Sequence, residues 1–449
     1  MNQPARKSPD FIKKSSMYQL FLRPFTPEGT LDAAARLLPS IAALGFDIVY
    51  LCPITLADDD PREEFWSTRQ KASGCGNPMN PYRMADFFQI DPEYGDNAAL
   101  TRFVNKSHSL GMKVILDLVY LHCGPSPVFL ESHPEYMQLA EDGTVKNGPW
   151  CFPLLNYESP ALREYLWSNM EYFIREFDVD GYRCDVGDGV PLDFWEEGRR
   201  RIEALKPDVF MLNEGMKPEY LLRAFDLNYE FGWQSVLEKA LSGEGSVRDM
   251  VARWTEMHDQ LPEGGQVIRF IDTHDVANES YDKRLETRLG TKGVEAALVV
   301  NYTLDGMPFV YNGYEVCDTA KHNIFANRFH GRNFIDWSGA LTEKGQQRME
   351  LLCLLNELKH DQIALQEGDT AWLTTTQPDR LAAFTRTAGG ERIAVLVNTA
   401  DAPLAAQVEL PGFAEEVACE LLEYGTAWKQ TENGLSISLL PRGYAVIKY

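Results

Sequence analysis

The sequence has no apolar run long enough to span a membrane, and residues 1–16 carry basic side chains without the apolar core of a signal peptide. Its eight cysteines are scattered with no Cys-x-x-Cys spacing, so we interpret them as reduced structural thiols. Its eight histidines show no spacing typical of metal ligands. These absences predict a cytoplasmic location, no membrane partner, no metal and no cofactor.

The sequence has few basic residues relative to acidic ones: 43 Lys and Arg and 66 Asp and Glu residues give a net charge of −23. Such a surface repels phosphate backbones, so we expect no nucleic-acid partner and favour an uncharged ligand. The sequence has no repeat of solenoid period and no low-complexity segment. Its 449 residues are enough for a barrel of about 250–400 residues and a small second domain.

Short apolar runs alternate with helical patterns over most of the chain. The run at 47–54 is almost continuously apolar, as expected of a strand that is buried on both faces. Eight such strands alternating with helices predict an α/β fold, the (β/α)8 TIM barrel. The predicted strands cover 17–25, 47–54, 113–122, 181–185, 209–214, 225–229, 267–272 and 307–313.

The pattern changes at two places. Residues 123–158 are rich in proline and poor in helical periodicity, which predicts a short excursion domain over the mouth of the barrel. From residue 365 onward, short alternating runs separated by turns predict a C-terminal antiparallel β-sandwich over 365–449. The barrel itself is therefore expected to comprise 1–122 and 159–364.

Three of the strand candidates lead into acidic residues. Arg183 and Asp185 are two residues apart, so both side chains face the same side of an extended strand. Glu214 ends the next apolar run, and Asp275 follows a third. A single acid in such a place is commonly a polar residue where a buried strand reaches the surface. Three in series match the C-terminal face of a barrel, where barrel enzymes build their active sites.

The motifs around these acids resemble those of the α-amylase family of glycoside hydrolases, in the family's order and over nearly the whole chain. The resemblance implies that Asp185 is the nucleophile, Glu214 the general acid and base, and Asp275 a third carboxylate that grips sugar hydroxyls. Retaining glycosidases hold the first two carboxyls about 5–5.5 Å apart, which neighbouring barrel strands can supply. The matching segments are YRMADFFQIDPEYG (82–95), ILDLVYLH (115–122), DGYRCDVGD (180–188), MLNEG (211–215), FIDTHD (270–275) and GMPFVYNGYE (306–315).

The resemblance also implies substrate-binding roles for further side chains. An arginine beside the nucleophile keeps it ionised, an aspartate holds that arginine, two histidines hydrogen-bond the sugar and a tyrosine ring lies under it. The acid Glu214 emerges from an apolar run near other acids, so we expect a raised pKa there. The residues in these roles are Arg183, Asp117, His122, His274 and Tyr82.

The chain departs from the family pattern after the nucleophile. Endo-acting amylases often carry a Lys-His pair where this chain has Asp188 and Gly189, which argues against a liquefying amylase. Val186 follows the nucleophile directly, as in oligo-1,6-glucosidases and in the cyclomaltodextrinase and neopullulanase group, and the bond type stays open between α-1,4 and α-1,6. We expect no counterpart of the carbohydrate-binding domain that often precedes the barrel in the latter group.

These features predict a retaining α-glucoside hydrolase that acts on short gluco-oligosaccharides by double displacement. One alternative keeps the site and changes the acceptor, as in a glucanotransferase or a sucrose-class transglycosylase. A second alternative is a sugar-binding relative without catalysis, against which the three acids argue. The sequence does not define the oligomeric state.

The calcium site that many family members carry between the barrel and the excursion is predicted to be missing. Leu121 and Leu154 stand where an asparagine and an aspartate usually supply oxygen ligands, and Ca²⁺ takes about 6–8 oxygens. Elemental analysis of protein purified without chelator should find no stoichiometric calcium. One calcium ion per chain would contradict this prediction.

Overall fold

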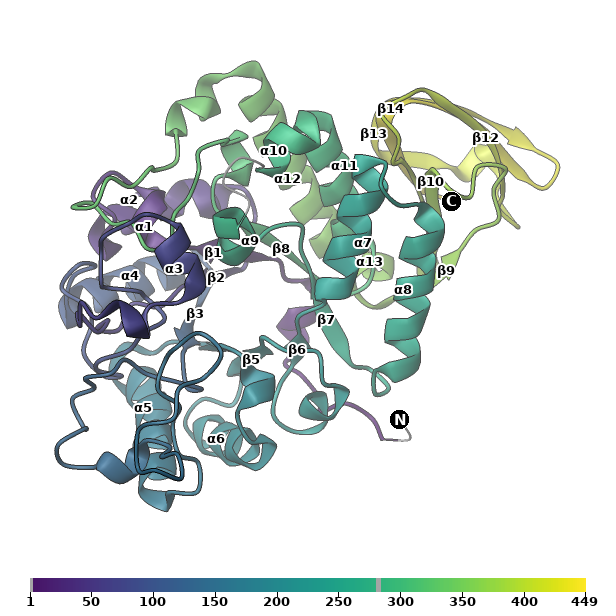
Figure 1. Cartoon of the computed structure of the whole chain (residues 1–449). Helices are drawn as coiled ribbons and strands as arrows, with labels where there is room; N and C mark the ends of the chain where they lie inside the picture. Colours follow the sequence, from purple (N-terminus) through teal and green to yellow (C-terminus); the bar gives the residue numbers. More distant parts are fainter. Residues whose placement is uncertain (1–2, 280–283) are drawn as a thin grey trace.

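The computed structural model describes residues 3–279 and 284–449 and shows a closed parallel barrel followed by an antiparallel β domain (Figure 1). Residues 1–2 and 280–283, which the barrel prediction includes, lie outside the described residues. The strands follow chain order around the ring, and β8 pairs with β1, so the predicted TIM barrel is confirmed. The strands are β1 (Met17–Leu20), β2 (Ile48–Leu51), β3 (Lys113–Leu118), β4 (Gly181–Cys184), β5 (Phe210–Asn213), β6 (Leu227–Asn228), β7 (Gln266–Arg269) and β8 (Met307–Tyr311).

Helices surround the barrel, and their ends follow ordinary capping chemistry. Asp96 accepts a hydrogen bond from the Ala99 amide (2.8 Å) at the start of α4, and Ser159 does the same for Leu162 (3.3 Å) at the start of α5. In the described part of the chain, no helix is both long and apolar enough to cross a bilayer. The main helices are α2 (Leu31–Ala43), α4 (Asn97–Ser109), α5 (Pro160–Phe177), α6 (Leu192–Leu205), α7 (Phe231–Ser242), α8 (Val247–Gln260), α11 (Gly290–Thr303) and α12 (Glu343–Asp361).

Several elements differ from the sequence-based expectation. The strand expected over 17–25 ends at Leu20, and the single-turn helix α1 (Leu22–Phe25) follows it, with Pro24 at a helical position. The helix expected over 285–304 splits into α10 (Leu285–Arg288) and α11, because Gly290 has a φ of +69°. Helices α7 and α12 were not predicted. The buried face of α12 carries polar side chains as well as leucines, among them Arg348, Asn356 and Lys359.

The segment 123–158 is largely irregular in the structure. Isolated β-bridges join Met137 to Leu155 and Asn147 to Pro153. A further bridge joins His122, which follows β3, to Leu154. This last bridge anchors the segment beside the mouth of the barrel.

The C-terminal part of the chain forms an antiparallel β domain, as predicted. A bridge between Thr375 and Val408 connects the chain beyond one edge strand to the strand at the other edge, which folds the sheet over on itself. The sheet order is β12 (Leu404–Glu409), β14 (Gly434–Lys448), β11 (Glu391–Asn398), β10 (Leu381–Ala388) and β9 (Asp369–Trp372), with β13 (Cys419–Thr431) paired to β14.

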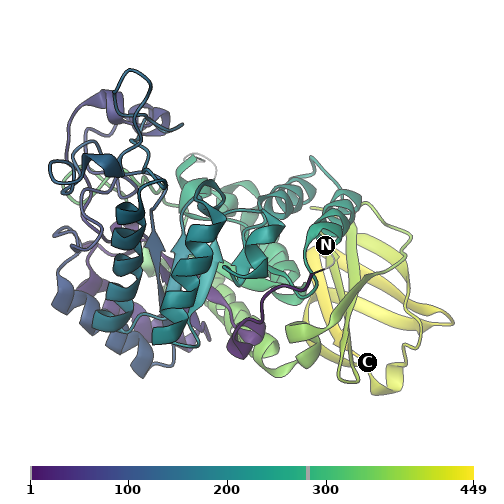
Figure 2. The same cartoon turned by 90° about the horizontal axis from the view of Figure 1, so that it is seen from below.

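The C-terminal domain shares its core with the barrel. Along β11, Ile393, Val395 and Val397 belong to the apolar cluster that continues into the barrel, whereas Ala394 and Leu396 belong to the domain's own cluster. Alternation with a period of two therefore gives the strand two buried faces. Figure 2 shows the domain pressed against the helical side of the barrel, with no extended linker between them.

The register of β4 against β5 depends on Gly181. This residue has a φ of +150°, and a Cβ atom at its position would lie 1.8 Å from the carbonyl oxygen of Phe210 on β5. Backbone cannot move away from such a contact without breaking the ladder between the two strands.

We expect Gly181→Ala to lower the free energy of unfolding by about 3 kcal/mol or more, because it combines a clash with a strained φ. The matched control is Gly111→Ala, where φ is +82° and no atom lies within 4 Å of the added Cβ. That control substitution should lower the free energy of unfolding by only about 1 kcal/mol. Thermal unfolding followed by circular dichroism compares them, and equal midpoints for the two variants would contradict the prediction.

Candidate active site

Two carboxyl groups emerge side by side at the C-terminal ends of β4 and β5. Cys184 pairs with Asn213 in the ladder, so the residues that follow, Asp185 and Glu214, are neighbours. The ladder continues one step beyond the strands, because the Glu214 amide donates to the carbonyl of Cys184 (3.1 Å) and the Asp185 amide donates to that of Leu118 (2.9 Å). Regular strand backbone therefore holds both carboxyls up to the point where they leave the barrel.

One buried guanidinium, that of Arg183, binds three carboxylates. Its Nη1 donates to Asp117 (2.7 Å) and to Asp185 (2.8 Å), and its Nη2 lies 2.6 Å from an oxygen of Glu214. The planar group thus fixes one oxygen of each carboxyl relative to the others. Asp117 is held from its other side by the hydroxyls of Tyr50 and Tyr82.

This cluster has more negative than positive groups, so it retains a proton. Burial raises the pKa of Glu214 to about 7, where the negative charge of Asp275 adds to the effect and Arg183 opposes it. Burial also raises the pKa of Asp185, against the attraction of Arg183. Asp185 receives a well-directed hydrogen bond from Arg183, whereas the Glu214 contact with Nη2 is an ion pair without that direction, so we assign the shared proton to Glu214.

Val186, which directly follows Asp185 in the sequence, has a strained backbone. Val186 adopts a left-handed φ of +43°, which is an outlier for a β-branched residue. In this conformation its amide donates to the second oxygen of Glu214 (2.7 Å), and the next amide, that of Gly187, donates to the Glu214 carbonyl (3.1 Å). The strain therefore positions a donor on the carboxyl group that carries the proton.

Asp188 explains one departure from the family pattern. Its carboxylate accepts hydrogen bonds from the Asn213 side chain (3.0 Å) and from the amides of Met216 (2.8 Å) and Lys217 (3.1 Å). The acid therefore fixes the turn that follows Glu214. This structural role was not predicted from the sequence, which showed only that the Lys-His pair is replaced by Asp188 and Gly189.

The third acid, Asp275, lies at the start of α9 (His274–Glu279), beyond β7. Burial disfavours its charge, but His274 and Arg69 more than offset this and lower its pKa. Arg69 donates to a carboxylate oxygen of Asp275 (3.0 Å) and to its carbonyl (3.2 Å). Sequence reasoning missed Arg69, which lies in the connection between β2 and β3 in a stretch without a recognised motif.

His274 is oriented by contacts to both of its ring nitrogens. Gln19 contacts Nδ1 (2.6 Å) and the hydroxyl of Tyr82 contacts Nε2 (2.6 Å), while the rings of Tyr82 and His274 stack with centroids 5.2 Å apart. Burial lowers the pKa of His274 and lowers that of His122 to about 4. Both histidines are therefore neutral near pH 7.

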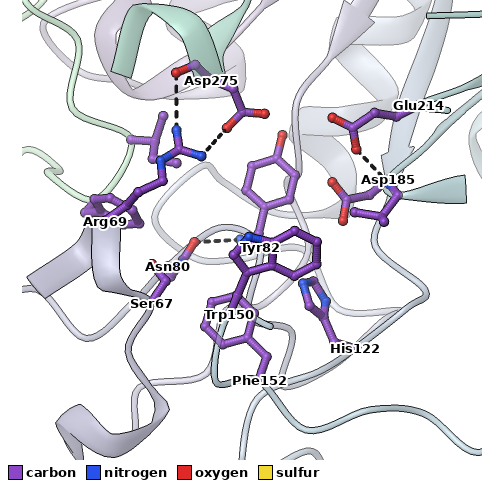
Figure 3. Close-up of a pocket in the computed structure, with 13 residues that line it drawn as sticks. Ser67, Arg69, Asn80, Tyr82, His122, Trp150, Phe152, Asp185, Glu214 and Asp275 are labelled. Atoms are coloured by element: carbon purple, nitrogen blue, oxygen red, sulfur yellow. Dashed lines mark hydrogen bonds and ion pairs between the residues drawn. The ribbon is translucent and has the colours of Figure 1, made fainter. Parts of the chain in front are cut away.

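These groups surround one hollow, whose cavity volume is about 100 Å³. Figure 3 shows Asp275 and Arg69 across the hollow from Asp185 and Glu214, with Tyr82 between them in the view. Arg183 and His274 are buried and contact the lining acids, and the buried Asp117 binds Arg183. The lining comprises Ser67, Arg69, Asn80, Tyr82, His122, Trp150, Phe152, Asp185, Val186, Glu214, Asp275, Ile324 and Phe325.

Clustered acids like those that line this hollow can also bind a metal ion. Among residues 3–279 and 284–449, no group of three or more His, Cys, Asp and Glu side chains is arranged to bind one. The acids of the hollow are instead neutralised by two arginines and a proton. A protonated carboxyl beside an ionised one, at the mouth of a TIM barrel, defines a glycoside hydrolase.

Comparison with known proteins identifies its family. Residues 9–142 and 150–363 match the model of the α-amylase catalytic domain, and residues 373–446 match the maltogenic amylase C-terminal domain. The chain therefore belongs to the α-amylase family, and it is a retaining α-glucoside hydrolase.

Two longer relatives and one solved structure match most of this chain. The chain is 26% identical to a cyclomaltodextrinase of Geobacillus thermopakistaniensis, over 98% of this chain and 78% of that protein. It is 24% identical to an intracellular maltogenic amylase of Bacillus subtilis, over 85% of this chain and 68% of that protein. The crystal structure of an α-amylase from Lactobacillus plantarum has the same fold, with a TM-score of 0.79 and 24% identity over 98% and 99% of the two chains.

The raised pKa of Glu214 predicts the alkaline limit of activity. Glu214 holds its proton below its pKa of about 7, so kcat/KM should fall as the pH rises through that value. The two histidines of the site, with lowered pKa values, do not titrate there. Initial rates measured between pH 4 and 9 test this, and a decline centred near pH 4–5, the ordinary range of a glutamate, would contradict it.

Proposed function

We propose that this hydrolase cleaves α-glucosidic bonds in short gluco-oligosaccharides by double displacement through an ester of Asp185. The observation that supports this most directly is the pair of buried carboxyls, Asp185 and Glu214, on one guanidinium. Retaining glycosidases require such a closely spaced pair, with one member ionised and the other protonated.

In the first step, an oxygen of Asp185 attacks the anomeric carbon while Glu214 gives its proton to the glycosidic oxygen, which leaves with its sugar. In the second step, the ionised Glu214 takes a proton from a water molecule. The water oxygen attacks the same carbon and the ester bond to Asp185 breaks. Two inversions give net retention, and both acids return to their starting state.

The remaining residues are proposed to bind and orient the sugar. Asp275 is ionised and half-exposed in the hollow, so it can accept hydrogen bonds from sugar hydroxyls as positive charge develops on the ring. Neutral His122 lines the hollow and serves as a hydrogen-bonding group, and the ring of Tyr82 offers an apolar surface to C–H groups. His274, expected from the sequence to bind the sugar, has both ring nitrogens engaged by Gln19 and Tyr82 and therefore positions Tyr82. Asp117 positions Arg183, which in turn positions the acids.

The substrate class rests on the relatives. They are named a cyclomaltodextrinase and an intracellular maltogenic amylase, which supports short gluco-oligosaccharides as substrates, with the bond type open between α-1,4 and α-1,6. A maltosyltransferase of Salinibacter ruber is 25% identical over 87% of this chain, which keeps transfer to a sugar acceptor as the second candidate. Early products longer than maltotriose, formed from maltotriose, would indicate transfer.

Two coarser features are also proposed. The intracellular relative supports a cytoplasmic location. The interruption of the catalytic-domain match at 142–150 and its end at 363 support an excursion domain at 123–158 between the barrel parts 1–122 and 159–364, and a separate domain at 365–449.

Chemical rescue distinguishes the roles of the two acids. We expect Asp185→Ala to lower the hydrolysis rate by at least about 10⁴-fold, because no ester can form. With α-glucosyl fluoride, whose fluoride leaves without a proton, azide should enter the vacated space and attack the anomeric carbon directly, giving the β-glucosyl azide.

The matched variant is Glu214→Ala. It keeps the nucleophile, so fluoride should leave, the ester should form, and azide should then displace Asp185 to give the α-glucosyl azide. Proton NMR of the products identifies the anomer. The same anomer from both variants, or an unchanged rate in Asp185→Ala, would overturn the assignment.

A further inference from the structure

The loops that follow β2 and β8 meet above β1, because β2 and β8 are the neighbours of β1 in the ring. Arg23, just after β1, ties them together. Its guanidinium donates to the carbonyl of Ile324 in the β8 loop (2.5 Å) and to that of Met79 in the β2 loop (2.9 Å), and it forms a two-point ion pair with Glu93 (2.9 Å each). Since Arg23 and Glu93 are buried, this connection is not exposed to competing water.

A second connection lies closer to the hollow. The side-chain amide of Asn77 donates to the carbonyl of Phe325 (2.8 Å), and that of Gln70 donates to the carbonyl of Asn77 (3.1 Å). Gln70 lies in the short helix α3 (Thr68–Ala72), which also carries Arg69. We call residues 66–80 together with 322–327 the end wall, because both segments contribute side chains to the lining of the hollow.

The end wall lies opposite the acid. In a closed ring of eight strands, β5 is diametrically opposite β1, and Glu214 follows β5 whereas the end wall is joined above β1. Because Glu214 protonates the leaving oxygen, the departing part of the substrate must lie on the β5 side. The sugar that forms the ester, and everything attached to its non-reducing side, must then extend toward the end wall.

We propose that the end wall makes this enzyme exo-acting: it accepts chains by their non-reducing end and releases units of one or two sugars. The inference rests on the proposed hydrolase function and specifies its substrate class. The hollow is lined by both acids and by Phe325, so in the described part of the chain the end wall bounds the hollow on the side toward which the non-reducing part of the substrate extends. Arg69, bound to Asp275, presents its guanidinium to the terminal sugar and is the specificity-determining side chain.

Two heptasaccharides test the proposal on the unmodified enzyme. Maltoheptaose and β-cyclomaltodextrin have the same seven glucose units and the same linkage, but the ring has no non-reducing end. The linear chain should be cleaved, with glucose or maltose as the first products, and the ring should be cleaved at least about 100-fold more slowly. Comparable rates, or early products of intermediate length, would overturn the exo proposal alone.

A second pair of substrates removes the influence of ring shape. Nitrophenyl maltoheptaoside with a free non-reducing end should be cleaved, and the same compound with a 4,6-ethylidene group on that end should resist cleavage. Equal cleavage of both would overturn the exo proposal while leaving the hydrolase intact. No cleavage of either compound, or of maltoheptaose, would refute the proposed function itself, and the exo proposal with it.

A wall variant links the selectivity to the structure. Asn77→Ala removes the hydrogen bond to Phe325 and should raise the rate on the ethylidene compound, relative to the free compound, by about 10-fold. Arg62→Ala is the control, because this exposed side chain in the same connection pairs with Asp60 outside the hollow. An unchanged ratio in folded Asn77→Ala would overturn the end wall as the cause, and the measurements on the unmodified enzyme decide the proposal if that variant does not fold.

Discussion

The charge of Arg183 is the interaction on which the rest of the site depends. A buried guanidinium that contacts three carboxylates compensates only part of their charge, so the cluster keeps a proton that none of these acids would hold in water. The strand register supplies this geometry: Arg183 on β4 pairs with Asp117 on β3 and is followed by the end of β5. The positions of the acids and their protonation thus have one common origin.

The ring of strands divides the work of the molecule. Strands β3 to β5 carry the buried acids and the arginine, and the strained backbone at Val186 belongs to the same side. The loops after β2 and β8 supply neither acid of the pair; they are bound to each other through Arg23 and Asn77 and restrict the space. A barrel permits this division because each loop can change without altering the strands beneath it.

The sequence was informative where one local pattern determined both structure and position. Apolar strands with acids at their ends predicted the barrel, and the ends of adjacent parallel strands necessarily meet, so Asp185 and Glu214 could be expected together. Arg69 could not be found in this way, because it lies in a connection without periodicity and its partner is some two hundred residues away. The role of Asp188 depends on backbone amides of another loop, and the buried face of α12 mixes leucines with the buried Arg348 and Lys359, which weakens its apolar pattern.

The two-faced strand β11 has a consequence for how this chain can be divided. Its inward residues, Ile393, Val395 and Val397, cover apolar helix surface on the barrel. The sheet of the C-terminal domain therefore also forms part of the barrel's hydrophobic core. A barrel truncated after residue 364 would expose this apolar surface to solvent. We expect such a fragment to aggregate or to bind another molecule through that surface. In this chain, the fused C-terminal domain keeps that apolar helix surface out of water.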